Sequence, residues 1–241
     1  MAFNKGPSII SNGLYYYIDP ANSNYYSGST TTINNMIGAP GPNLNLINNP
    51  SYNSTNAGVL AFDGASSYIQ VPQDSVTMTQ GSSDFSIGGW IYPTRTGPNN
   101  LWAAYFAGQQ YYPATFINVS SGASGSSGMY LQYYTGAVYN TYIVNAPYSM
   151  SINNWYNYCG VVQRSTTTFT AYINGYSIGS ATIPSSWSRP ISDIQIFSNY
   201  ATGNTDFFGG YLGPMYLYSR ALNSSEILQN YNAIAGRYSL T

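Results

Sequence analysis

The 241-residue chain contains no histidine, a single cysteine and few charged residues: six Lys and Arg, and seven Asp and Glu. Charged residues make up 5% of the chain, against roughly 25% in ordinary globular proteins. Without histidine there is no Ser-His or Cys-His dyad and no histidine-ligated zinc, and one cysteine excludes thiolate clusters and intrachain disulfides. These absences exclude most classes of enzyme.

The carboxylates that remain show no arrangement typical of a glycosidase. Hydrolysis of a glycosidic bond normally needs two carboxyl groups about 5–10 Å apart, one of them kept protonated. The only glutamate, Glu226, lies at the expected start of a helix, and the six aspartates are scattered along the chain without a shared motif. We therefore predict that the protein is not an enzyme.

A basic surface and a long apolar segment are missing as well. The net charge of −1 and the pI near 4.9 argue against nucleic acid as a partner. No run of about 18 apolar residues is present, which argues against a membrane span, and the N-terminus lacks the features of a secretory signal. With the initiator Met, this favours an intact chain that reaches the outside as a virion component released by lysis.

Glycine, proline and tyrosine are abundant instead, with 24, 13 and 27 residues respectively. Short runs of β-branched and aromatic residues recur between Gly, Pro and Asn clusters, which is typical of an all-β fold with two packed sheets. We expect a single domain over residues 1–241, with residues 1–12 as an N-terminal arm. Residues 20–58 are expected to form loops with short strands. About a dozen strands are predicted, chiefly over residues 13–19, 67–72, 84–93, 101–107, 114–119, 130–134, 139–144, 155–163, 168–173, 176–178, 191–198 and 210–219.

Two local signals are specific. Asn174-Gly175 supplies the two positive φ angles that a type I′ hairpin turn needs. Asn223 followed by Glu226 is a capping box that predicts a short C-terminal helix, for which Gly236 offers a C-terminal cap. The helix should dock through one apolar face.

The order of these segments resembles a known family, the laminin-G-like, concanavalin A-like jelly-roll domains of phage and bacterial surface proteins. The resemblance covers roughly residues 13–238 and rests mostly on scaffold motifs, so it predicts fold better than function. It implies an antiparallel jelly-roll sandwich with a short C-terminal helix, whose relatives bind sugars or proteins, sometimes with Ca²⁺. The strand with three alternating carboxylates of the β-glucan hydrolases is missing. The matching segments are residues 13–20, 62–64 with 68–72, 85–93, 155–175 and 208–222 with 225–227.

The tyrosine surplus is the main candidate for a binding surface. Neighbouring residues of a strand face opposite sides, so one tyrosine of each adjacent pair should point away from the core. Such residues either fill the sheet faces or form a contact surface for sugars or subunits, and Tyr is common in binding loops. The candidates surround a Gly/Ser-rich loop: Tyr111, Tyr112, Tyr133, Tyr134, Tyr139 and Tyr142.

Metal and thiol chemistry have weaker support. No cofactor is expected, although a hard cation such as Ca²⁺ takes carboxylate and carbonyl oxygens, and Asp63 and Asp206 are the first candidates for it. Both residues are expected instead to hydrogen-bond their own turns. Cys159 falls within a strand and should be buried as a small hydrophobic residue.

The low charge and the Tyr enrichment resemble the composition of an interface. We therefore interpret the chain as a non-enzymatic structural protein of a tailed-phage virion, in the head decoration, tail or fibre, that contacts other virion proteins and copies of itself. The alternative is a carbohydrate-binding or host-adhesion module that binds cell-surface glycans.

Overall fold

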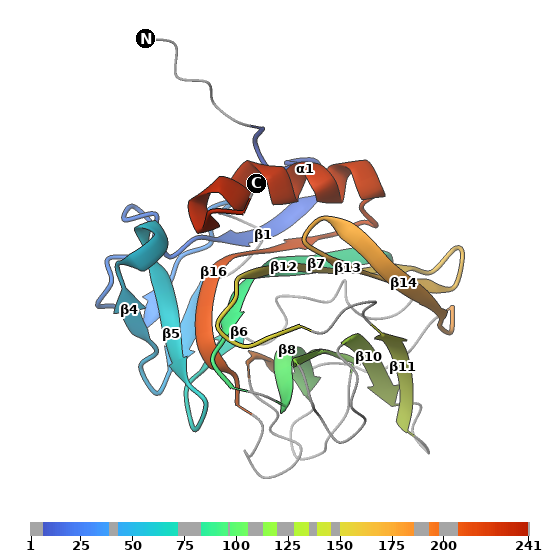
Figure 1. The fold of residues 1–241 in the computed structure, drawn as a ribbon, viewed down its shortest axis with the longest axis horizontal. Coiled ribbons are helices and arrows are strands. Elements are labelled where there is room, and N and C mark those ends of the chain that lie inside the picture. The colour runs from blue at the N-terminus through green and yellow to red at the C-terminus, as the bar shows by residue number, and fades with distance from the viewer. Residues whose placement is uncertain are drawn as a thin grey trace.

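The computed structural model describes residues 7–38, 43–71, 83–95, 97–105, 113–119, 128–134, 139–145, 150–185, 193–197 and 207–240. The fold is all-β, as predicted, with two antiparallel sheets of eight strands each and one short α-helix. Figure 1 shows the sheets as two facing layers, with the helix on the outer side of one of them. No helix in these ranges is long and apolar enough to cross a membrane.

The first sheet has the strand order β14-β13-β12-β7-β16-β5-β4, and β1 also pairs with β16. Its strands are β1 (Leu14–Ile18), β4 (Ser51–Asn53), β5 (Val59–Asp63), β7 (Phe85–Pro93), β12 (Tyr156–Gln163), β13 (Thr168–Ile173), β14 (Tyr176–Thr182) and β16 (Gly209–Tyr218).

The second sheet has the order β11-β10-β9-β8-β15-β6-β3-β2. Several of its strands are short, and β2 and β3 come from the region expected to be mostly loops. Its strands are β2 (Thr32–Ile33), β3 (Leu44–Ile47), β6 (Tyr68–Val71), β8 (Gly97–Tyr105), β9 (Pro113–Val119), β10 (Gly128–Tyr134), β11 (Tyr139–Asn145) and β15 (Asp193–Ile196).

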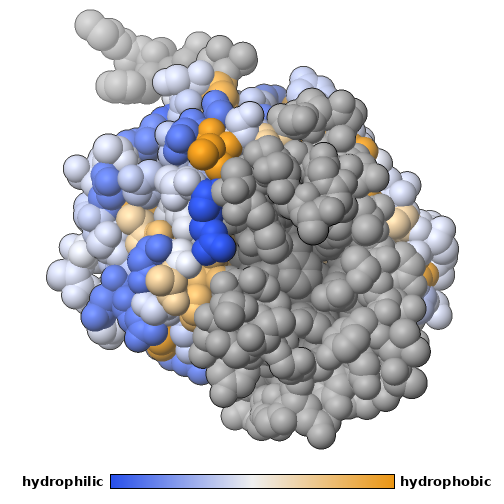
Figure 2. Space-filling view, turned by 60° about the horizontal axis from the view of Figure 1, so that its bottom comes forward, coloured by the Kyte–Doolittle hydropathy of each residue, from blue (hydrophilic) through white to orange (hydrophobic). Residues whose placement is uncertain are grey.

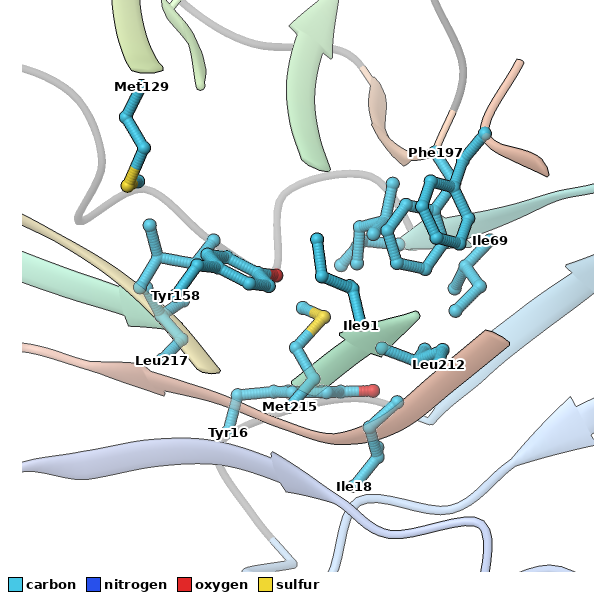
Figure 3. Packing of buried hydrophobic residues seen from close by; sticks show 14 of the residues in the cluster. Tyr16, Ile18, Ile69, Ile91, Met129, Tyr158, Phe197, Leu212, Met215 and Leu217 are labelled. Atoms are coloured by element: carbon cyan, nitrogen blue, oxygen red, sulfur yellow. The ribbon is translucent and has the colours of Figure 1, made fainter. Parts of the chain in front are cut away.

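The main core lies between the two sheets and follows from strand alternation. On β6, Ile69 and Val71 are buried while Tyr68 and Gln70 are partly exposed, as the sequence pattern predicts. Figure 3 shows residues of the two sheets, together with Phe197 directly after β15, that meet in this core: Tyr16, Ile18, Ile69, Ile91, Met129, Tyr158, Phe197, Leu212, Met215 and Leu217.

The centre of the first sheet is buried on both faces. β7 lies between β12 and β16, and nearly every residue of the three strands is buried. The outer face is covered by α1 (Ser224–Ile234), which crosses above β16, β12 and β13 in Figure 1. Trp90 of β7 is fully buried beneath this helix layer. The helix therefore builds a second, smaller core on the outer face.

The N-terminal end of α1 is as predicted, and its C-terminal end is not. The Asn223 side chain accepts from the Glu226 N–H, and the Glu226 carboxylate accepts from the Asn223 N–H, so the capping box is confirmed. The predicted cap at Gly236 is wrong, because the chain continues into the 3₁₀ helix η4 (Ala235–Tyr238) and Ser239 takes the left-handed conformation with φ 58°. This extra turn brings Tyr238 onto the sheet.

The Asn174-Gly175 hairpin is confirmed. Asn174 has φ 51° and Gly175 has φ 83°, and Ile173 pairs directly with Tyr176 across the turn. A second 3₁₀ turn, η1 (Thr55–Ala57), connects β4 to β5.

The described part of the N-terminal arm is bound to α1. The Ile10 N–H donates to Asn230 Oδ1 at 2.8 Å, and Gln229 Nε2 donates to the Ser8 carbonyl at 2.9 Å. The Tyr218 hydroxyl donates to the Ile10 carbonyl at 2.7 Å. These bonds attach the arm to the same outer layer that covers Trp90.

Candidate functional site

Only the backbones of four predicted contact tyrosines are described. Tyr133 and Tyr134 lie on β10 and Tyr139 and Tyr142 on β11, where Tyr134 is paired directly with Tyr139. Their side chains are outside the described part of the chain, as are Tyr111 and Tyr112 as whole residues. The contact role of all six stays a prediction.

Asp63 closes a tight turn after β5. Its Oδ1 accepts hydrogen bonds from the N–H groups of Ala65, Ser66 and Ser67 and from the Ser67 hydroxyl, at 2.8–3.0 Å, and its Oδ2 accepts one from the Ser66 hydroxyl at 2.7 Å. Burial acts to raise the pKa of this carboxyl, but the hydrogen bonds from Ser67, Ala65 and Ser66 hold it well below its usual range. The predicted turn-capping role of Asp63 is confirmed.

Calcium binding stays a prediction. Asp63 uses Oδ1 fully within its own turn, and Asp206 lies outside the described residues. In the described ranges, no three or more Cys, Asp or Glu residues come together in a group that would hold a metal ion.

The hydrogen bonds of the Asp63 turn predict that the stability of the fold depends on pH. Because the folded-state pKa of Asp63 is lowered, its carboxylate stabilises the fold above its unfolded pKa of about 3.9 and loses that effect as the pH falls below it. We expect Asp63→Asn to lower the melting temperature clearly near neutral pH and by less at about pH 3. Thermal melts of both proteins across this range measure the difference. A difference that is the same at every pH would contradict a carboxylate held ionised by its turn.

Cys159 is fully buried, as predicted. Burial raises the pKa of its thiol to about 12, so the nucleophilic thiolate is not available at neutral pH. The residue packs among Tyr216, Tyr218 and Ile227 beneath α1.

An aromatic row crosses three neighbouring strands on the outer face of the first sheet. We use this name for Trp155, Tyr92 and Tyr211. Tyr211 of β16 is paired with Tyr92 of β7, and Trp155 directly precedes β12, whose Tyr156 is paired with Ile91. Residues that are paired across strands carry their side chains on the same face. The three rings are therefore neighbours because of the register in which these strands pair.

The rings of the aromatic row are in contact and partly exposed. The Tyr92 ring centroid lies 5.5 Å from that of Trp155 and 5.5 Å from that of Tyr211, with interplanar angles of 54° and 46°. All three side chains are partly exposed. Below them, the buried Tyr238 ring lies 3.9 Å from Trp155, centroid to centroid, and 4.7 Å from Trp90. The buried rings fix the position of the partly exposed ones.

Polar groups flank both ends of the aromatic row. Asn153 and Asn154, which directly precede Trp155, are exposed. At the other end, Ala61 of β5 is paired with Tyr211 and also with Ser51 of β4. Four strand spacings separate Trp155 from Ser51, a distance of about 19 Å at about 4.8 Å per strand. This surface is long enough for several sugar units.

A small pocket lies where the row reaches the sheet edge. We call it the end pocket; its volume is about 170 Å³. Its lining combines the paired residues of β5 and β4 next to the row with the Asp63 turn and the turn between β3 and β4: Asn48, Asn49, Ser51, Ala61, Phe62, Asp63 and Ser67.

The aromatic row and the end pocket were not predicted from the sequence. The alternation along residues 84–93 puts Tyr92 on the same strand face as Trp90. Its neighbours, however, depend on which strands pair and in which register. The surplus of tyrosine was the only sequence signal, and it does not distinguish these rings from the other tyrosines.

The described carboxylates are engaged in the structure. Asp19 pairs with Arg237 at 2.7 Å and Glu226 with Arg220 at 2.7 Å, while Asp84 accepts from the Arg164 N–H at 2.6 Å. With Asp63 bound in its turn, each of these groups has a structural role.

The two facing antiparallel sheets, with one helix on the outer face of the first, define an all-β sandwich. The sequence profile of the Concanavalin A-like lectin/glucanases superfamily matches residues 63–228, more than half of the chain. The protein belongs to this superfamily, and the concanavalin A-like fold predicted from the sequence is confirmed. No curated protein matches the sequence significantly.

Several solved structures share the fold at low sequence identity. Domain 4 of AbnA, an extracellular arabinanase of Geobacillus stearothermophilus solved with arabinotriose, has a TM-score of 0.66 and 15% identity, covering 90% of this chain and 98% of that one. The binding domain of botulinum neurotoxin DC, solved with SialylT, has a TM-score of 0.66 and 14% identity, covering 92% of this chain and 52% of that one. The binding domain of Paraclostridial Mosquitocidal Protein 1 has a TM-score of 0.66 and 18% identity, and the match again covers 92% of this chain and 52% of that one.

This chain therefore spans nearly all of the arabinanase domain but about half of each toxin domain. At these identities the likeness shows the fold alone.

Proposed function

We propose that the protein is a non-catalytic carbohydrate-binding module whose glycan lies across the aromatic row. The observation that carries this proposal is the row itself: three partly exposed rings in register, with exposed amides at one end and a polar pocket at the other. Support comes from the arabinanase domain, which this chain matches over nearly its whole length and which was solved with arabinotriose.

The chemistry of the row suits sugars. The apolar C–H face of a sugar ring packs on an aromatic ring, and the sugar hydroxyls need amide, hydroxyl or carboxylate partners at the edges. Successive rings of the row are 5.5 Å apart, which is close to the length of one sugar unit. Because the rings are tilted by 54° and 46°, the row favours a twisted glycan over a flat one.

A binding role also fits those carboxylates whose side chains the structure describes. Asp19, Asp63, Asp84 and Glu226 each have structural partners, whereas a glycosidase needs one carboxyl group kept protonated and a second in reach of the same bond. This supports a module that holds a glycan without cleaving it.

Calorimetric titration with a panel of neutral trisaccharides tests the proposal, with arabinotriose first and xylotriose, cellotriose and maltotriose after it. We expect saturable binding by at least one of them, and we expect Trp155→Ala and Tyr211→Ala each to weaken it roughly tenfold, the effect of losing about 1.4 kcal/mol. Tyr211→Phe keeps the ring and should retain most of the affinity.

Tyr176→Ala is the matched control, because Tyr176 is 67% exposed at the tip of the β13–β14 hairpin, outside the row. Thermal melts of each variant separate a lost contact from a lost fold. If no trisaccharide of the panel binds, or if the row variants bind as well as the unmodified protein, the proposal is wrong.

Assembly into a virion is the second candidate, and the composition favours it. With net charge −1 and 5% charged residues, little electrostatic repulsion keeps copies of the chain apart. Figure 2 shows one face on which hydrophilic residues predominate in the described part and apolar ones lie in small groups. Light scattering after size exclusion at several concentrations separates the two candidates: a glycan-binding module stays monomeric, and a virion component forms a defined oligomer.

A further inference from the structure

We infer that the end pocket binds the terminal residue of a neutral glycan, so that the protein recognises chain ends. This inference rests on the proposed function, because the rest of the glycan would lie on the aromatic row. Ala61 lines the pocket and is paired with Tyr211, so a chain stacked on the row reaches the pocket at its last unit.

The size of the pocket limits it to one sugar. Its volume of about 170 Å³ is below the range of about 300–1,000 Å³ typical of pockets for drug-sized ligands. A single sugar ring fits, whereas two do not. The pocket therefore takes one unit of a glycan, and the units next to it lie on the aromatic row.

The pocket is formed before any ligand arrives. Asn48 and Asn49 both have left-handed backbone conformations, with φ 55° and 51°, and Asn48 Nδ2 donates to the Ser66 carbonyl at 2.9 Å. That bond joins the β3–β4 turn to the Asp63 turn, which five hydrogen bonds to the carboxylate hold in place. A preformed site loses little conformational entropy on binding.

The lining offers the groups that a sugar needs. Asp63 Oδ2 accepts one hydrogen bond, from Ser66, and keeps capacity for a sugar hydroxyl. Asn49 and Ser51 are exposed and supply an amide and a hydroxyl, and the Ala61 methyl group supplies a small apolar contact for the ring.

The charge of the lining favours a neutral sugar over an acidic one. Asp63 is the one charged residue among the lining residues, and it would repel a uronic acid or a sulfated sugar. Arg95, which bonds the turn next to Asp63, lies outside the lining and donates to the Gly64 and Phe207 carbonyls at 2.8 and 3.0 Å.

The test uses variants of the pocket and the same four trisaccharides. Ala61→Leu fills the pocket, and the double variant Asn49→Ala with Ser51→Ala removes two polar partners. Each should weaken binding of the trisaccharide that binds best about fivefold, the effect expected for one or two hydrogen bonds, with an unchanged melting temperature. Tyr176→Ala again serves as the control.

A second measurement does not depend on variants. The best-binding trisaccharide is coupled to a surface through its reducing end and, separately, through its non-reducing end. We expect the protein to bind only one of the two surfaces, because the coupled end cannot enter the pocket. Oxidation of the free terminal sugar to its uronic acid should weaken binding as well.

The outcomes separate the two proposals. Equal binding to both surfaces, together with pocket variants that bind normally while Trp155→Ala does not, overturns chain-end recognition and leaves the proposed function standing. Absence of binding by the unmodified protein to all four trisaccharides overturns both. Weakening by Ala61→Leu and by the double variant, with binding to one surface only, supports the inference.

Discussion

Replacement of Trp90 by alanine is expected to lower the free energy of unfolding by about 3–5 kcal/mol, the usual range for a buried Trp or Phe changed to Ala. Trp90 is fully buried on the outer face of the first sheet. Its ring stacks on Tyr231 of α1, with a centroid distance of 5.5 Å and an angle of 16°, and on Tyr238 of η4, at 4.7 Å and 28°. The substitution removes the centre of the contact that holds the C-terminal helix.

Urea denaturation followed by circular dichroism measures this loss. Tyr238→Phe is the matched control in the same cluster, because among the described residues the buried Tyr238 hydroxyl has no hydrogen-bond partner. Removing that hydroxyl should leave the free energy of unfolding unchanged or slightly raised. A loss below about 1 kcal/mol for Trp90→Ala would mean that the helix docks through other contacts.

The second large effect is expected at Gly88, where a single methyl group should cost about 3 kcal/mol or more. A Cβ at this position would lie 2.5 Å from the Tyr158 carbonyl oxygen and 2.5 Å from Cε2 of Tyr216. The Tyr216 ring is fully buried, and the carbonyl belongs to the backbone of the neighbouring strand β12. Neither can move without disturbing the centre of the sheet.

Gly236→Ala is the control for Gly88→Ala. No atom lies within 4 Å of a Cβ built at Gly236, and its φ is not in the positive range that disfavours other residues. The alanine should leave the stability unchanged or raise the free energy of unfolding by up to about 1 kcal/mol, because it lowers the conformational entropy of the unfolded chain. Equal denaturation midpoints for both variants would contradict the steric argument at Gly88.

Local signals in the sequence predicted local structure well. The hairpin at Asn174-Gly175 and the capping box of Asn223 and Glu226 are both present, because each depends on residues within a few positions of one another. The all-β class and the alternation on β6 were also predictable, since the period of the apolar residues reports directly which face is buried.

Predictions failed where distant contacts decide the local conformation. Gly236 was a reasonable helix cap by residue type, but the chain takes another 3₁₀ turn and Tyr238 stacks on Trp90. The favourable ring contact outweighs the local preference for ending at glycine. The sequence predicted that strands within residues 20–58 would be short but not where they lie, because β3 is placed by its pairing with β2 and β6, and β4 by its pairing with β5.

The type of contact at the candidate site was predictable from the sequence, but the position of the site in the fold was not. The excess of tyrosine indicated aromatic contacts, and the low charge excluded acid and base chemistry. Tyr92 and Tyr211 are 119 positions apart in the chain, and only the pairing of β7 with β16 brings them together. Composition contains no information about that register.

The position of β16 in the first sheet has a consequence for how the protein is made. This strand, which follows all the other described strands in the sequence, is hydrogen-bonded to β7, to β5 and to β1, so that Leu14 pairs with Tyr218. A nascent chain that has not reached Gly209 leaves β7 and β5 each with an unpaired edge, which invites association with other chains. Such non-local pairing makes folding slow. The ribosome must therefore deliver the chain as far as β16 before the first sheet can close, and folding depends on the earlier nascent segments staying apart until then.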